Sequence, residues 1–226
     1  MDRRRAQYTT EYVIILGIAM AVIAAALVYA LFFYTSYSSS SSSNQISTAA
    51  AQIVQAANYV SAQGADSKTV IAVTFPLLSV QSSFFCGDIV ELGSRASSYI
   101  DQANVNMSGL MPFIPGLYHA YLTFNGTITE MGLNFPLSSM DSSFSYSSGS
   151  IDYSLEFFDE NGDLLPDVTF NITVYSESGA YIASQTETSS NGQYSGSVPV
   201  STDLPLYIIR VFPRTYQVFY SACFFN

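Results

Sequence analysis

Apolar residues follow three different patterns along the chain, and the first is an uninterrupted block. The 22 residues from Val13 to Tyr34 include no charged side chain. About 20 helical residues cross the hydrocarbon core of a bilayer, so this block predicts one transmembrane helix. A cleavable secretory signal would have a shorter apolar core and a small-residue site after it, whereas this block ends in Leu31-Phe32-Phe33-Tyr34. A helix in a soluble core is rarely apolar on every face for six turns.

The second pattern is a helical period between residues 45 and 63. Its apolar side chains recur at steps of three and four residues, and Gly64 follows as a helix-stop signal. Residues 36–44, which include the serines Ser38 to Ser43, lie between the two helical segments. Because serine hydroxyls compete for backbone hydrogen bonds, we expect a hinge there, helical only if neighbouring subunits pack around it. The stripe consists of Ile46, Ala49, Ala50, Ile53, Ala57 and Val60.

The third pattern, from residue 65 onward, is the two-residue alternation of β-strands. Asn125-Gly126 between two β-rich runs predicts a hairpin with a type I′ turn, in which both central residues have positive φ. Residues 138–150 are mostly serine and suggest a second linker. The strands expected before this linker are 69–75, 84–92, 118–124 and 127–133, and those after it are 151–157, 168–174, 180–188, 193–198, 206–212 and 216–225.

The strand pattern predicts a mainly β fold with a long N-terminal helix. An antiparallel β-sheet domain would be followed by an Ig-like β-sandwich, because short strands with turns every 8–12 residues are typical of such sandwiches. The expected segments are a basic leader at 1–6, the transmembrane helix at 7–35, the hinge at 36–44, the amphipathic helix at 45–63, a β-rich domain at 64–148 and the sandwich at 149–226.

Charge sets the expected orientation. Arg3, Arg4 and Arg5 precede the apolar block, and the next basic residue is Lys68. Basic residues beside a span stay in the cytoplasm, so the N-terminus is expected inside and residues 36–226 outside, at the cell surface. The outer part carries fifteen of the seventeen acidic residues and four basic ones. This balance disfavours nucleic acid and anionic lipid as partners.

Candidate chemistry is sparse. His119 is the only histidine, and it is expected to be a surface or structural residue. The common metal, phosphate and nucleophile motifs are absent, so we expect neither enzymatic activity nor a cofactor. Asp159-x-Asn161-x-Asp163 has the spacing of a calcium loop, but Leu164 stands where that loop needs glycine. We therefore expect a turn and no metal, the alternative being a weak calcium site formed by Asp159, Glu160, Asp163 and Asp167.

Two features would matter on the outside of a cell. Cys86 and Cys223 can form a disulfide in an oxidising compartment; two buried thiols are the alternative. Three Asn-x-Ser/Thr sequons are candidate N-glycosylation sites. Asn125 is the most accessible because it lies in the predicted turn. The sequons begin at Asn106, Asn125 and Asn171.

The N-terminus carries a recognisable motif. Arg3-Arg4-Arg5-Ala6 is followed by Gln7-Tyr8-Thr9-Thr10-Glu11-Tyr12 and then the apolar block. This arrangement resembles archaeal type IV pilin precursors with a class III signal peptide, except that Thr9 stands where serine is usual. The resemblance implies cleavage between Ala6 and Gln7 by a prepilin-type peptidase. It also implies that Glu11 pairs with the new α-amino group of a neighbouring subunit during assembly.

The last 78 residues show a weaker resemblance. Asp159-Glu160-Asn161-Gly162, Gly179 and Asn191-Gly192-Gln193-Tyr194 are similar to turns of carboxypeptidase regulatory-like, or transthyretin-like, β-sandwiches. Such modules space, display or bind, which implies no catalysis.

Two functions follow from these observations. The first is a structural subunit, minor or at the tip, of a type IV pilus-like filament, with other pilins as partners and with β domains exposed for adhesion. The second is a membrane-anchored extracellular binding module that does not polymerise. The sequence does not identify the extracellular ligand.

Overall fold

The computed structural model describes the backbone of residues 2–94, 97–200 and 203–226, and the side chains of residues 16–33, 42–94, 97–200 and 203–226. The chain divides into two compact units, residues 1–41 and 42–226. The fold is mainly β with one long N-terminal helix, α1 (Asp2–Gln63), as the sequence predicts.

Helix α1 runs without a break through the serine segment 36–44. The backbone of the predicted hinge is helical, which is the alternative that the sequence left open, and the boundary between the two compact units falls within it. Serine costs only a few tenths of a kcal/mol per residue relative to alanine in a helix, whereas glycine or proline costs more. The segment contains neither, and extending a helix that already exists on both sides requires no new nucleation. The helix ends where Gly64 was expected to stop it, with that glycine at φ 98°.

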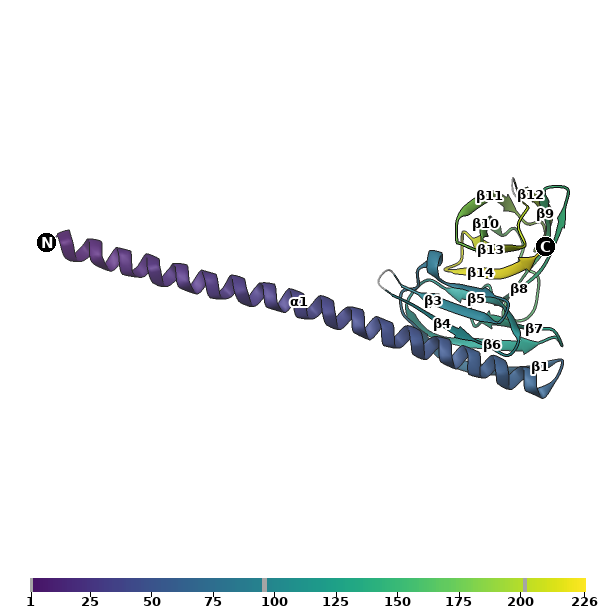
Figure 1. Cartoon of the computed structure of the whole chain (residues 1–226), viewed down its shortest axis with the longest axis horizontal. Helices are drawn as coiled ribbons and strands as arrows, with labels where there is room; N and C mark the ends of the chain where they lie inside the picture. The colour runs from purple at the N-terminus through teal and green to yellow at the C-terminus, as the bar shows by residue number, and fades with distance from the viewer. Residues whose placement is uncertain (1, 95–96, 201–202) are drawn as a thin grey trace. The chain divides into compact units, whose positions relative to one another are not determined.

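The strands of residues 42–226 form one large sheet and two small ones (Figure 1). The large sheet has eight strands in the order β1-β6-β7-β5-β14-β13-β10-β11, and the small sheets have the orders β12-β9-β8 and β2-β3-β4. Only the β5–β7 pairing is parallel in the described sheets. The first seven strands are β1 (Ser67–Phe75), β2 (Phe84–Cys86), β3 (Ile89–Gly93), β4 (Ser98–Gln102), β5 (Asn106–Pro112), β6 (Gly116–Phe124) and β7 (Ile128–Leu133). The others are β8 (Ser139–Ser147), β9 (Ser150–Phe158), β10 (Thr169–Ser176), β11 (Tyr181–Thr188), β12 (Gln193–Pro199), β13 (Leu206–Pro213) and β14 (Val218–Phe225).

The C-terminal part of α1 packs against one face of the large sheet, beside β1 and β6 (Figure 1). The predicted stripe is buried: Ile53 and Ala57 have no exposed surface, and Ile46 and Val60 have 1%. On β1, Val73 and Phe75 face the same core, while Val70 on the opposite face is 54% exposed. Small alanines let the helix approach the sheet closely, so this half of the helix belongs to the β domain.

The small sheet β12-β9-β8 packs over the C-terminal half of the large sheet and completes a β-sandwich. Aromatic rings fill the space between the two layers: the ring of Phe157 on β9 lies 5.3 Å from that of Phe170 on β10, which lies 5.4 Å from that of Tyr194 on β12. Such ring pairs are stabilising beyond their buried area. A β-sandwich was predicted for this part of the chain, but the predicted domain boundary differs from the one in the structure.

Residue 149 is not a domain boundary, because strands from both predicted domains share one sheet. β14 pairs with β13 on one side and with β5 on the other. The predicted linker 138–150 is β8 together with a tight turn into β9, where Ser148 (φ 50°) and Gly149 (φ 83°) both have positive φ. Met140, Phe144 and Tyr146 alternate with polar residues in β8, but the many serines hid that period.

The sheet β2-β3-β4 is an excursion from the large sheet, and contacts with β13 and β14 help to hold it in place. The predicted strand 84–92 is in fact the hairpin β2–β3, which turns at Gly87 (φ 58°). A disulfide joins Cys86 of β2 to Cys223 of β14. Arg210 of β13, 2% exposed, lies 4.6 Å from the Tyr175 ring and donates to the Gln81 carbonyl oxygen at 3.2 Å. Burial lowers the pKa of Arg210.

Candidate functional site

The most distinctive surface of the chain is the apolar segment Leu16–Phe33 of α1. Its mean hydropathy is 2.5, and none of it is buried within the described chain. Leu16 is 51% exposed and Phe32 is 72% exposed. Because these side chains contact no core, the segment is not the core helix of a soluble protein. Its length and composition fit a membrane anchor or a signal sequence.

Small residues are spaced regularly within this segment. Gly17, Ala21 and Ala25 recur every fourth position, so they lie on one face of the helix. No atom comes within 4 Å of the position that a Cβ would take on Gly17, apart from the helix itself. Faces of this small-xxx-small type let two helices approach closely in a bilayer. Ala19, Ala24 and Ala26 are the other small residues between 17 and 26.

The predicted processing and assembly residues fall on a part of α1 whose side chains lie outside the described residues. Ala6, Gln7 and Glu11 belong to the helix by their backbone, and nothing further is described for them. Cleavage after Ala6 and pairing of Glu11 therefore remain predictions. No acidic or basic residue, and no histidine, occurs from Tyr12 to Ala65, over the whole remainder of the helix.

The exposed face of the second half of the helix is polar but uncharged. Thr48, Gln52, Gln55 and Tyr59 recur at steps of three and four on the side turned away from the sheet, and Tyr59 is 60% exposed. Gln52, Gln55 and Tyr59 line a shallow groove beside Thr69 and Ile71 of β1. This face differs from the apolar segment Leu16–Phe33 in polarity, and neither of the two carries a charged residue.

The candidate calcium loop is a turn in which the Asp159 carboxylate accepts hydrogen bonds from backbone N–H groups of the turn itself. Asp159 Oδ1 accepts hydrogen bonds from the backbone N–H groups of Asn161 (2.8 Å) and Asp163 (2.9 Å). The bond from the Asp163 N–H is the main reason that the pKa of Asp159 is lowered. Within the described residues, no three His, Cys, Asp or Glu side chains converge to hold a metal ion. The turn interpretation therefore accounts for the geometry.

A cavity of about 380 Å³ lies at the edge of the sandwich layer, and we call it the layer-edge cavity. One side is formed by β1, β6 and β7, and the other by the start of β8 and the turn after β9. Burial, and then the charge of Asp141, raises the pKa of Glu130; burial, and then the charge of Glu156, raises the pKa of Asp141. The lining residues are Lys68, Gly109, Tyr121, Thr123, Glu130, Met131, Gly132, Ser138, Ser139, Met140, Asp141, Asp159, Glu160 and Gly162.

A buried hydroxyl network lies close to Glu130 and Asp141. The hydroxyls of Tyr220 and Ser142 are 2.7 Å apart, and the Tyr220 hydroxyl also bonds to Ser108. Burial raises the pKa of Tyr220 to about 12, and the charges of Glu130 and Asp141 act in the same direction. The network fixes β8 against β5 and β14 and so holds one wall of the layer-edge cavity in place.

The remaining predicted residues lie apart from one another. Asn125 is exposed in the β6–β7 loop, where its Oδ1 accepts from the N–H groups of Thr127 (3.0 Å) and Ile128 (2.9 Å). Asn106 is exposed at the start of β5, whereas Asn171 lies within β10 and accepts from the Ser184 hydroxyl. Glycosylation at all three remains a prediction. His119 is exposed on β6.

Sequence reasoning missed the layer-edge cavity. Its residues come from six separate stretches between Lys68 and Gly162, and only the turn that includes Asp159, Glu160 and Gly162 has a local motif. Only the strand register brings Lys68, Thr123 and Glu130 into one row.

Comparisons with known proteins give little further information. No protein-family model matches the sequence, and no curated protein is found to match it. A solved structure of a DUF3823 family protein from Bacteroides ovatus aligns over 70% of this chain and 97% of that one, with 11% sequence identity and a TM-score of 0.34. A likeness at this TM-score carries no argument about function.

Proposed function

We propose that this chain is a subunit, of the minor or tip type, of a type IV pilus-like filament at the cell surface. An N-terminal apolar helix followed by a β domain is an arrangement compatible with a membrane-anchored surface module. The filament is the more specific proposal. In it, the apolar helix first holds the subunit in the membrane and then packs among the helices of other pilins, while the β domain is displayed for adhesion.

The proposal rests on one observation: two parts of the same helix differ in burial. Residues 46–60 belong to the core of the β domain, whereas Leu16–Phe33 presents an apolar surface that nothing in the described chain covers. Exposed apolar area of this size is unfavourable in water, so it requires a partner outside the chain. Lipid meets this requirement before assembly, and the helices of other subunits meet it afterwards.

The sequence gives a reason why the helices of other subunits would replace lipid around this segment. A glutamate at the edge of an apolar span is unfavourable unless it is paired. In the proposed mechanism, a prepilin-type peptidase cuts between Ala6 and Gln7, and the new α-amino group pairs with Glu11 of a neighbouring subunit. The same cut removes Arg3, Arg4 and Arg5, which would otherwise hold the helix end at the cytoplasmic surface.

A membrane-anchored binding module that never polymerises is the second candidate. The layer-edge cavity favours it, because a concave site with several polar groups suits ligand binding and has no role in helix packing. Both candidates give the chain a structural or binding role without catalysis or a cofactor. Both place residues 36–226 outside the cell.

The test is to recover the native protein from membranes and from the material that shear releases from cells. The filament predicts a chain that begins at Gln7 and sediments as large particles after shearing. Glu11→Ala should abolish these particles while the domain still reaches the surface. Glu160→Ala, which removes an exposed carboxylate in the β domain, is the matched control and should assemble normally. A chain that begins at Gln7 but stays in the membrane would favour the anchored module, and an uncleaved chain would refute the filament.

A further inference from the structure

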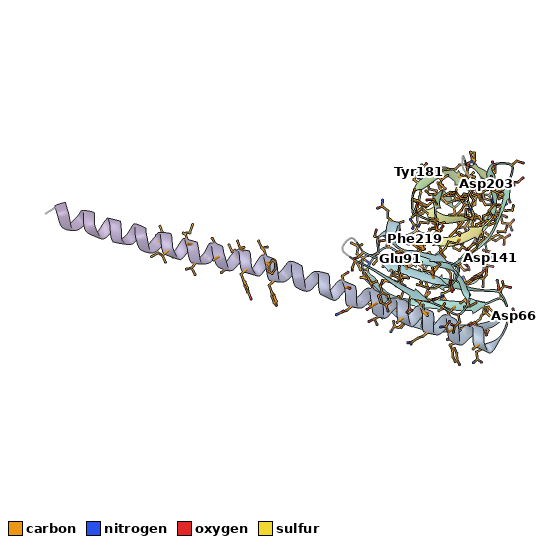
Figure 2. All side chains as sticks on the ribbon, viewed as in Figure 1. Asp66, Glu91, Asp141, Tyr181, Asp203 and Phe219 are labelled. Carbon is orange, nitrogen blue, oxygen red and sulfur yellow. A yellow bond between two sulfur atoms is a disulfide. The ribbon has the colours of Figure 1, made fainter. Side chains whose placement is uncertain are left out.

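The layer-edge cavity arises from a step between two layers. The small sheet β12-β9-β8 covers only part of the large sheet, so the face of β1, β6 and β7 turned away from the helix is left open where β8 begins. Figure 2 labels Asp141, which stands on β8 at this wall. A corner of this kind offers a floor of strands and a wall of side chains, which is the form of most small-ligand sites.

Strand register places the floor residues in two parallel rows. Lys68, Thr123 and Glu130 form one row across β1, β6 and β7. The next row on the same face contains Tyr121, which pairs with Gly132. Rows two residues apart along a strand are separated by roughly 7 Å, which is close to the width of one sugar ring.

Tyr121 supplies a flat apolar surface at the open side of the cavity. Its side chain is 37% exposed, and its neighbour Gly132 has no side chain that could cover the ring. A Cβ on Gly132 would lie 2.7 Å from the Ser138 carbonyl oxygen, so glycine is required there by the entry of β8. An aromatic face beside hydrogen-bonding groups suits a ligand that has an apolar C–H face and a rim of hydroxyls.

Glu130 and Asp141 supply the complementary acceptors. An ionised carboxylate accepts up to four hydrogen bonds, and both side chains line the cavity. The Thr123 hydroxyl and the Lys68 ammonium are donors in the same row. The cavity lining therefore offers carboxylate acceptors, two donors and one aromatic ring, and a polyhydroxyl ligand can interact with all three.

Charge and coordination disfavour other ligand classes. Four carboxylates line the cavity (Glu130, Asp141, Asp159 and Glu160) against one ammonium, which opposes an anionic ligand. The described residues include no set of three side chains that could hold a metal ion. Lys68 stands in the same row as Glu130 and repels an organic cation from that end of the site.

We propose that the layer-edge cavity binds one or two neutral sugar rings of an extracellular glycan. Tyr121 stacks on the sugar face, Glu130 and Asp141 accept from its hydroxyls, and Thr123 and Lys68 donate to them. The inference rests on the proposed function only in that the domain faces outward, and it does not require polymerisation.

The test uses the full chain in a detergent without a sugar headgroup. The neutral trisaccharides maltotriose, cellotriose, mannotriose and chitotriose are titrated by saturation-transfer NMR and calorimetry. We expect at least one to bind with a Kd below about 10 mM. Tyr121→Ala should weaken binding about three- to tenfold, and Glu130→Gln about tenfold or more. Tyr181→Ala and Glu177→Gln are the matched controls, because both residues are exposed and lie outside the cavity.

Thermal melting of each variant shows whether the domain is intact. The proposal is overturned if none of the four sugars binds, if the controls weaken binding as much as the cavity variants, or if putrescine or galacturonate binds better than every neutral sugar. Glu11→Ala should bind the sugar as the wild type does. A failure of assembly and a failure of glycan binding are therefore distinguishable.

Discussion

Two segments of one helix have similar composition and opposite surroundings. Leu16–Phe33 and residues 46–60 are both uncharged and rich in alanine and branched aliphatic residues. The side chains of the second segment that face the sheet are at most 8% exposed, whereas large apolar side chains of the first are 51–72% exposed. The second segment finds its partner in the sheet of its own chain. The apolar side chains of the first segment stay exposed within the described chain.

Apolar content alone therefore does not decide whether a helix is buried. The second segment keeps a polar side, with Thr48, Gln52 and Gln55 turned to solvent, and this one-sidedness marks a helix that packs on a sheet. The first segment is apolar on every face, and this uniformity is typical of a membrane anchor or a signal sequence.

The largest effect is expected from a charge placed in each segment. Ala24→Arg puts a charge in the middle of the apolar segment, at a cost of about 2.5–3.5 kcal/mol for insertion. It should abolish membrane retention and assembly while leaving denaturant unfolding of the β domain unchanged. Ala57→Arg buries a charge against the sheet and should unfold the domain instead. Cell fractionation and unfolding curves measure the two effects, and identical behaviour of the two variants would refute the distinction.

A milder pair of substitutions should show the same separation. Ile53 is fully buried, so Ile53→Ala should lower the free energy of unfolding of the β domain by about 2–5 kcal/mol. Leu27, 59% exposed, provides the matched control, and Leu27→Ala should change that free energy by less than about 0.5 kcal/mol. Urea titration in detergent gives both values. Equal losses would mean that the apolar segment contributes to the fold of the domain.

Loss of the disulfide should lower the stability of the β domain and leave membrane retention unchanged. It links Cys86 to Cys223 across 137 residues and ties the β2-β3-β4 excursion to the C-terminal strand. Replacing both cysteines with serine should cost about 2–5 kcal/mol of domain stability, since the unfolded chain loses a long closed loop. Membrane retention should not change, and a loss of retention would show that anchoring depends on the domain.

The smallest effect is a pH dependence confined to the β domain. The folded state raises the pKa of Glu130, so it holds that proton more tightly than the unfolded state does. Stability should therefore fall as the pH rises from the ordinary glutamate pKa, about 4.5, through the higher folded value. Glu130→Gln should flatten this part of the curve and be at least as stable as the wild type near pH 7. Urea midpoints measured from about pH 4 to pH 7 test this, and unchanged curves would contradict it.

The features that composition decides could be predicted from the sequence, and the features that long-range pairing decides could not. The apolar block, the buried stripe and the β6–β7 hairpin were all predicted. The shared sheet was not, because the β5–β14 pairing joins residues more than a hundred positions apart and has no local signal.

Turn chemistry shows the same limit at short range. Asn125-Gly126 was expected to form a type I′ turn, but only the glycine has positive φ, because the Asn125 side chain caps the loop instead. The type I′ geometry occurs at Ser148-Gly149, in the segment taken for a linker, and at Asn191-Gly192. The layer-edge cavity could not have been found from sequence, because it depends on which strands the second layer leaves uncovered.

Packing of the apolar segments of different subunits against one another is tested most directly by disulfide cross-linking between them. Each residue from Gly17 to Ala26 is replaced in turn by cysteine, and material sheared from the cell surface is oxidised and analysed on non-reducing gels. We expect covalent dimers whose yield rises and falls with the helical period, and we expect Glu11→Ala to abolish them. If the cysteines never react with one another and are labelled only by a lipid-soluble reagent in membranes, the packing of these helices in a filament is contradicted.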